Sequence, residues 1–159
     1  MNEMKKIKNP NGTETKAPII THAFAVEKGP YGSIWKIYIE AEDPDGDMDK
    51  IAIVVNQVGY GSYPTDWIIL KPQYRNHLIG FLQWNTFSSK ASVLPEWTRI
   101  IVKVSIFDKA KNESDEVIFP FTFESGVKGQ DEYPLPAPFD RGNLPRIGHI
   151  MVDLHYQTI

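Results

Sequence analysis

The stretch EAEDPDGDMDKI, residues Glu40–Ile51, ends one run of alternating apolar and polar residues and begins the next. At its centre, Pro44-Asp45-Gly46 has the composition of a type I turn, with the glycine in the left-handed region. The residues on both sides alternate with the period of a β-strand that buries one face. The stretch therefore predicts two half-buried strands joined by an acidic loop.

The alternation extends over most of the chain and predicts the core. The residues expected to face inward next to the loop are Trp35, Ile37, Ile39, Ala41, Ile51, Ile53 and Val55. Further strands are predicted within Ile19–Glu27, Trp67–Lys71, His77–Trp84, Trp97–Asp108 and Asp115–Phe123. About seven short strands separated by turn residues are typical of an all-β protein, and specifically of an immunoglobulin-like antiparallel two-sheet sandwich.

Three regions are predicted. Residues 1–16 are polar and aperiodic, which favours a flexible leader, and residues 17–125 form the sandwich. Residues 126–159 begin with a proline-rich arm, which we expect to run extended across a surface because prolines are poorly tolerated in central strands. The last segment, IGHIMVDLHYQTI, alternates again and predicts an extra edge strand, which could join the sandwich or the sheet of a second copy in a homo-oligomer.

Composition excludes several functions. The net charge of -3 offers no basic field, so nucleic acid is not expected as a partner, and no apolar run is long enough to predict membrane insertion. Without cysteine the chain has no disulfide, no thiolate nucleophile and no Cys-ligated metal. The sequence has no Gly-x-Ser-x-Gly elbow, no His-Glu-x-x-His motif and no phosphate loop, so we predict that the protein is not an enzyme.

Carboxylates at alternate positions of the acidic loop offer the hard oxygen ligands that Ca²⁺ prefers. They belong to Asp43, Asp45, Asp47 and Asp49. The loop is no EF-hand, because counting from its first aspartate places Met48 and Val54 where that motif needs glycine and glutamate. Further ligands would come from Asp108, with Asn112, in the loop after a later strand. The alternative is that the aspartates only shape and solvate a turn.

A second candidate site is aromatic. The stretch GYGSYPTDW contains Tyr60, Tyr63 and Trp67, and exposed flat rings can stack on sugars. The alternative is that Trp67 fills the core together with the other tryptophans of the chain, Trp35, Trp84 and Trp97.

Two motifs resemble a known group of domains. AEDPDGDMDKI is similar to the acidic turn of bacterial immunoglobulin-like, PKD-like and cadherin-like domains, and IIVKVSIFDKAKNES with VIFPFTF is similar to their last hairpin. Lys111 stands where glycine is usual in that hairpin, and lysine tolerates a positive φ poorly. The resemblance spans residues 17–125. It implies a non-catalytic structural or protein-interaction module outside the cytoplasm, periplasmic, secreted or on the cell surface. Its partners would be proteins or neighbouring domains.

Overall fold

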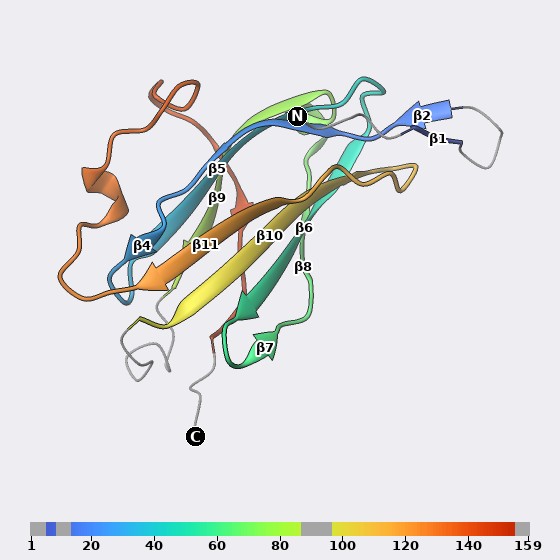
Figure 1. The fold of residues 1–159 in the computed structure, drawn as a ribbon. Helices are drawn as coiled ribbons and strands as arrows, with labels where there is room; N and C mark the ends of the chain where they lie inside the picture. The colour runs from blue at the N-terminus through green and yellow to red at the C-terminus, as the bar shows by residue number, and fades with distance from the viewer. Residues whose placement is uncertain (1–5, 9–13, 87–96, 155–159) are drawn as a thin grey trace.

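Two β-sheets pack face to face in the computed structural model, which describes residues 6–8, 14–86 and 97–154 (Figure 1). The first sheet has the order β12-β9-β5-β3, formed by Arg146–His149, His77–Asn85, Ile34–Glu42 and Ile19–Phe24. The second has the order β4-β11-β10-β6-β7, formed by Lys28–Gly29, Val117–Phe123, Arg99–Asp108, Met48–Gln57 and Gly61–Ser62. β8, Asp66–Ile69, pairs with β6 as well.

The predicted immunoglobulin-like sandwich is confirmed by this strand order. Each of the seven predicted segments contains a strand, namely β3, β5, β6, β8, β9, β10 and β11. Within residues 17–125, the two strands that the sequence did not predict, β4 and β7, are only two residues long each. The chain passes from one sheet to the other just after β3, since β3 pairs with β5 whereas β4 pairs in parallel with β11.

The core lies between the sheets and consists of the side chains that the alternation predicted. The inward residues of β5, β6 and β10 are at most 1% exposed, and they are Trp35, Ile37, Ile39, Ala41, Ile51, Ile53, Val55, Ile100, Val102, Val104 and Ile106. Of the tryptophans, Trp35 and Trp84 are buried, whereas Trp67 and Trp97 are 44% and 67% exposed. The alternative interpretation, in which all four tryptophans fill the core, is therefore wrong for Trp67 and Trp97.

The proline-rich arm runs across a surface, as predicted, and that surface is the outer face of the first sheet (Figure 1). Side chains along the arm pack against this face. Beyond the end of β3, the Gln130 side chain pairs with the exposed backbone of β5, where it accepts from Lys36 N–H at 2.5 Å and donates to Lys36 C=O at 2.9 Å. Phe139 is 1% exposed and its ring lies 5.6 Å from that of Tyr38. The Gln130 amide thus makes the two hydrogen bonds to Lys36 that the backbone of a neighbouring strand would make.

The predicted edge strand is present but short. β12 pairs in parallel with β9, and a Cβ at Gly80 of β9 would overlap the backbone carbonyl of Pro145, so glycine permits the close approach. Ile147, Ile150 and Leu154 then enter the common core. The boundary predicted at residue 126 therefore does not separate an appendage from the sandwich, because both share one core.

The predicted leader contains a short two-stranded sheet, in which β1, Lys6–Lys8, pairs with β2, Glu14–Lys16. Residues 1–5 and 9–13 lie outside the described residues. Across the described part of the chain, no helix has both the length and the apolar character needed to span a membrane.

Candidate metal centre

The acidic loop between β5 and β6 folds around the carboxylate of Asp43. Its Oδ1 accepts from Asp45 N–H at 3.0 Å and its Oδ2 accepts from Asp47 N–H at 3.1 Å. The backbone C=O of Asp43 accepts from Gly46 N–H at 3.1 Å, and Gly46 has a φ of 71°. These contacts confirm the predicted turn with its left-handed glycine and its Asx-type bonds.

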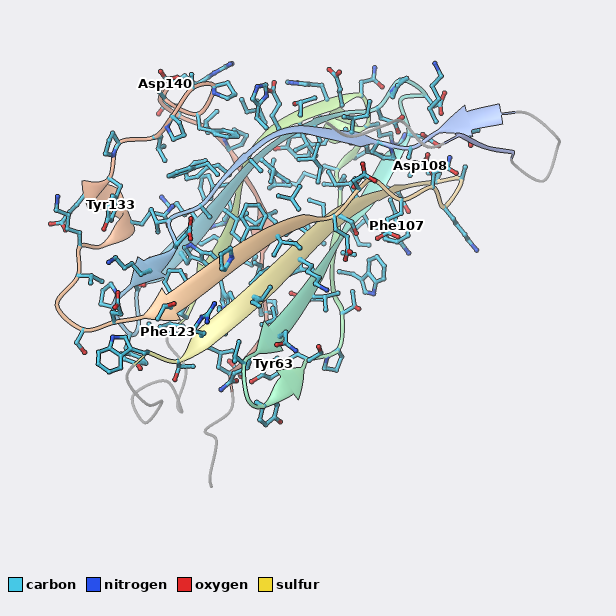
Figure 2. The ribbon with its side chains drawn as sticks, in the orientation of Figure 1. Tyr63, Phe107, Asp108, Phe123, Tyr133 and Asp140 are labelled. Atoms are coloured by element: carbon cyan, nitrogen blue, oxygen red, sulfur yellow. The ribbon has the colours of Figure 1, made fainter. Side chains whose placement is uncertain are left out.

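Asp108 lies on the same inward side of β10 as Val104 and Ile106, which brings its buried carboxylate to this loop. The register between β10 and β6 shifts between Phe107 and Asp108, at the end of β10 (Figure 2). The extra residue is Asp49, so the bulge lies in β6, where it turns Met48 into the core. Lys109 N–H then donates to Asp47 C=O at 3.0 Å, which fastens the β10–β11 hairpin to the acidic loop.

Four carboxylates meet as a result. Asp43, Asp45, Asp47 and Asp108 each offer a ligand atom, and these atoms all lie within 4.8 Å of one another. We call this group the acidic cluster. Asp49, also predicted as a ligand, is not a member. It falls within β6 and lines a hollow of about 330 Å³ with Trp67 and Phe107, which Asp108 also borders.

The left-handed turn of the hairpin places Asn112 beside the acidic cluster. Its backbone N–H donates to Asp108 Oδ1 at 2.8 Å, and its Nδ2 donates to Asp108 Oδ2 at 3.0 Å. Lys111 has a φ of 69°, so the turn expected from glycine forms here with lysine. The incoming N-terminal chain also contacts the site, since Lys16 N–H donates to Asp45 Oδ2 at 2.6 Å and Asn112 Nδ2 donates to Thr15 Oγ1 at 2.6 Å.

Burial makes this concentration of acids electrostatically costly. Asp43 is 5% exposed and Asp108 is 1% exposed. Burial, together with the hydrogen bond and the charge of Asp47, raises the pKa of Asp43 from 3.8 to about 7, against the backbone N–H groups that lower it. Burial also raises the pKa of Asp108. The ion pairs found among the described residues involve Glu40 and Glu124 and leave the acidic cluster without a compensating side-chain cation.

Two buried oxygens at the site have no hydrogen-bond partner, namely Asp47 Oδ1 and Asn112 Oδ1. Buried polar atoms are almost always paired, so orphaned acceptors among carboxylates indicate that a donor or a cation is required. The donor set is carboxylate and amide oxygen, which suits Ca²⁺ and not a soft metal. The residues present therefore fit the calcium ion that the acidic loop predicts.

The raised pKa of Asp43 leads to a prediction about pH. A folded state whose Asp43 has a pKa above the unfolded value binds more protons, so without metal the free energy of unfolding is expected to fall as pH rises from about 4 to about 7. Chemical denaturation across this range in chelator measures it. We expect excess calcium to remove the decline and Asp43→Asn to reduce it. A metal-free stability that rises through this range, or that Asp43→Asn leaves unchanged, would contradict the assignment.

The three predicted sugar-binding aromatics do not form one platform. The rings of Tyr60 and Tyr63 stack at 5.4 Å, and the Tyr63 hydroxyl donates to Gln57. Trp67 instead lies edge-on to Phe107 at 5.4 Å, under the Lys50 ammonium at 4.5 Å. Tyr63 and Phe107 lie toward opposite ends of the second sheet (Figure 2).

A second polar cluster was missed from the sequence. On the outer face of the first sheet, Glu40 lies between His22 and His77, which come from the two strands that flank β5. Hydrogen bonds from both imidazoles lower the pKa of Glu40, the bond to His77 most strongly. No local sequence motif predicts this group, because its members are far apart in the chain and meet only through strand pairing.

Comparison with known proteins finds similarity in fold. No known protein family and no curated protein matches the chain. The PKD domain of an M14-like peptidase from Thermoplasmatales archaeon SCGC AB-540-F20 is 16% identical, with a TM-score of 0.42 over 78% of this chain and 99% of its own. The fibronectin(III)-like modules of Clostridium thermocellum CbhA are 12% identical, with a TM-score of 0.40 over 77% of this chain and 61% of theirs.

Proposed function

We propose that this protein is a non-catalytic structural or protein-interaction module of an exported or cell-surface protein, and that Ca²⁺ bound at the acidic cluster stabilises it. The observation that carries the proposal is the convergence of the cluster's ligand atoms within 4.8 Å, next to two orphaned buried oxygens. Extracellular modules bind calcium at about 10⁻⁴ to 10⁻³ M, so the site would be filled outside the cell and empty in the cytosol.

Calcium at this site would act on more than one loop. The acidic cluster joins the β5–β6 loop to the β10–β11 hairpin, and it also accepts the backbone N–H of Lys16 from the incoming chain. An ion there would fix the direction in which the N-terminal segment enters the sandwich. That role suits a module whose task is to hold a neighbouring domain or partner in place.

A surface for protein contact is supported by the outer face of the second sheet. Ile118 of β11 is 57% exposed and Ile69 of β8 is 69% exposed, and both pair in register with outward lysines, Lys103 and Lys50. Exposed apolar side chains framed by charge are common where proteins bind one another.

Thermal unfolding with and without calcium tests the proposal. At about 10 mM calcium, an affinity of 10⁻⁴ to 10⁻³ M is expected to raise the melting temperature of a domain this size by about 3 to 10 °C. Magnesium should raise it far less, because Mg²⁺ gives up its water reluctantly and demands octahedral geometry. Equal melting temperatures in calcium and in chelator would reject a stabilising calcium site.

Carbohydrate binding is the second candidate function. Its support is the exposure of Tyr60 and Trp67, which are 47% and 44% exposed. A glycan array separates the candidates, because a structural module should give no signal, whereas a carbohydrate module should give one that Trp67→Ala or Tyr60→Ala removes.

A further inference from the structure

A bulge in β3 aims a histidine at a carboxylate on the neighbouring strand. Ile20 pairs with Ala41 and His22 pairs with the next residue of β5, Glu40, so Thr21 is the extra residue of β3. In an unbroken ladder, His22 would fall on the same face as Ile20, which is buried. The bulge turns it outward instead, and Thr21 Oγ1 donates to Glu40 C=O at 3.2 Å beside it.

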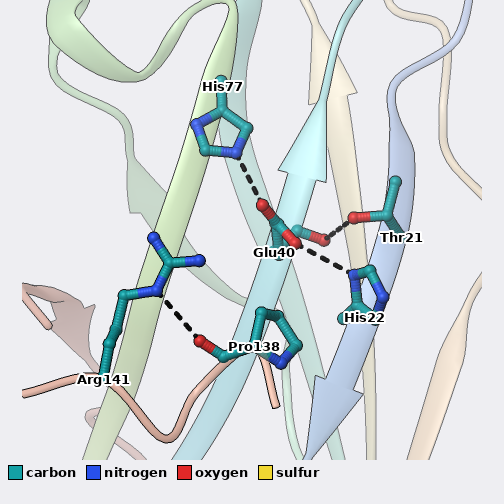
Figure 3. A network of polar contacts seen from close by, with 6 residues as sticks. All are labelled: Thr21, His22, Glu40, His77, Pro138 and Arg141. Atoms are coloured by element: carbon teal, nitrogen blue, oxygen red, sulfur yellow. Dashed lines mark hydrogen bonds and ion pairs between the residues drawn. The ribbon is translucent and has the colours of Figure 1, made fainter.

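A second histidine reaches the same carboxylate from the other side (Figure 3). His22 Nδ1 lies 2.9 Å from Glu40 Oε1, and His77 Nε2 lies 2.8 Å from Glu40 Oε2. Directly opposite His77 in the ladder is Glu42, a second acid on the outward face of β5. Three adjacent strands thus present two imidazoles and a shared carboxylate to solvent.

We propose that His22, Glu40 and His77 form a binding site for a divalent transition-metal ion of the Zn²⁺ class. Two imidazole nitrogens and a carboxylate are a donor set that zinc uses, with water in the remaining positions. The site differs in chemistry from the acidic cluster, whose all-oxygen ligands suit Ca²⁺. Glu42 supplies a further carboxylate on the same face.

To bind zinc at this site, only the side chains of the three ligands would have to move. Neighbouring donors around a tetrahedral zinc are about 3.3 Å apart, and both ring nitrogens already lie within 3 Å of a Glu40 oxygen. The three groups do not yet bring one atom each within 4.8 Å, as the acidic cluster does. The side chains of His22 and His77 are 54% and 51% exposed, so their rings can turn toward each other without repacking the core.

A bound ion would crosslink β3, β5 and β9 on the part of this outer face where His22 and His77 are exposed. β3 is an edge strand of its sheet and, among the described strands, pairs there with β5 alone. The ion would therefore fasten β3 to the sheet through a side chain as well as through its backbone. Arg141 of the arm lies next to this face, and its Nε–H donates to Pro138 C=O at 3.1 Å (Figure 3). The inference concerns residues outside the acidic cluster, so it holds or fails independently of the calcium proposal.

Calorimetric titration of tag-free protein with ZnCl₂, in saturating calcium to occupy the acidic cluster, tests the site. We expect one equivalent of zinc to bind, with loss of binding in His22→Asn and in His77→Asn. Matched controls are His149→Asn, at a histidine of β12, and Asp47→Asn, in the acidic cluster; both should bind zinc as the wild type does.

A spectroscopic readout locates the ligands. With Cu²⁺ as the probe, electron paramagnetic resonance should show hyperfine coupling to two nitrogens in wild type and to one in either histidine variant. Because the substituted side chains are exposed, the variants should fold, and circular dichroism verifies this. Absence of zinc binding, zinc binding unchanged in both histidine variants, or binding lost in Asp47→Asn alone would each overturn the proposal.

Discussion

The effect of Asp47→Asn on stability is expected to change sign between chelator and calcium. In chelator the variant should melt at or above the wild-type temperature, because it removes one like charge from the acidic cluster. Its new amide can also donate to Asp43, whose pKa the Asp47 carboxylate now raises. In calcium it should melt below the wild type, because it has lost a ligand charge and with it much of the stabilisation that the ion supplies.

The expected size of the difference follows from linkage. A ligand that binds only the folded state stabilises it by about 1.4 to 2.7 kcal/mol at 10 to 100 times its dissociation constant, so the wild type should gain this amount and the variant little of it. Asp49→Asn is the matched control. It lies two residues further along the same motif but outside the acidic cluster, so its response to calcium should equal that of the wild type.

Two results would contradict this account of the loop. If Asp49→Asn abolished the calcium response and Asp47→Asn did not, the ligand set would be wrong. If Asp47→Asn destabilised the protein equally in chelator and in calcium, the carboxylate would serve only the turn, and the alternative of a metal-free loop would be correct.

Phe139→Ala is expected to lower the free energy of unfolding by about 3 to 5 kcal/mol, the usual cost of truncating a buried aromatic side chain. Phe139 belongs to the arm, yet it is 1% exposed and lies against Tyr38, whose ring in turn is 5.6 Å from Phe81. The substitution removes the aromatic contact through which the arm covers the first sheet. Denaturant unfolding followed by tryptophan fluorescence measures the loss.

The control lies further along the chain. Met151→Ala truncates a side chain that is 77% exposed and should change stability by less than about 0.5 kcal/mol. A cost below 1 kcal/mol for Phe139→Ala, or a separate early transition that the variant alone removes, would show that the arm unfolds independently of the sandwich.

The fold could be predicted because alternation reports burial directly. In β10, inward residues such as Val102 and Val104 are fully buried while Lys103 between them is exposed, as the period of two requires. The arm could not be placed in the same way. Gln130 acts as a substitute strand through its side-chain amide, and no periodic pattern marks a contact of this kind.

The acidic cluster was predictable to the extent that its members lie in turns. Asp43 and Asp47 flank a recognisable Pro-Asp-Gly turn, and Asp108 ends a strand before a second turn. Asp49 was assigned wrongly to the cluster because the alternate spacing of the aspartates continues past the point where β6 begins. The spacing is that of ligands, but the extended strand carries Asp49 away from the loop.

The pairing of His22, Glu40 and His77 could not be predicted from the sequence. It depends on the register of three strands and on a bulge at Thr21, and one residue of slip in β3 would turn His22 to the buried face. Alternation predicted that Glu40 faces outward from β5. It gave no information about which residue of a neighbouring strand lies beside it.

The central claim is that Ca²⁺ occupies the acidic cluster, and a crystal structure of the protein grown in millimolar calcium tests it most directly. We predict an ion with carboxylate oxygens of Asp43, Asp45, Asp47 and Asp108 at about 2.3 to 2.6 Å, the calcium–oxygen range. The claim would be contradicted by four carboxylates that enclose only water or a shared proton, or by calcium bound elsewhere while this cluster holds none.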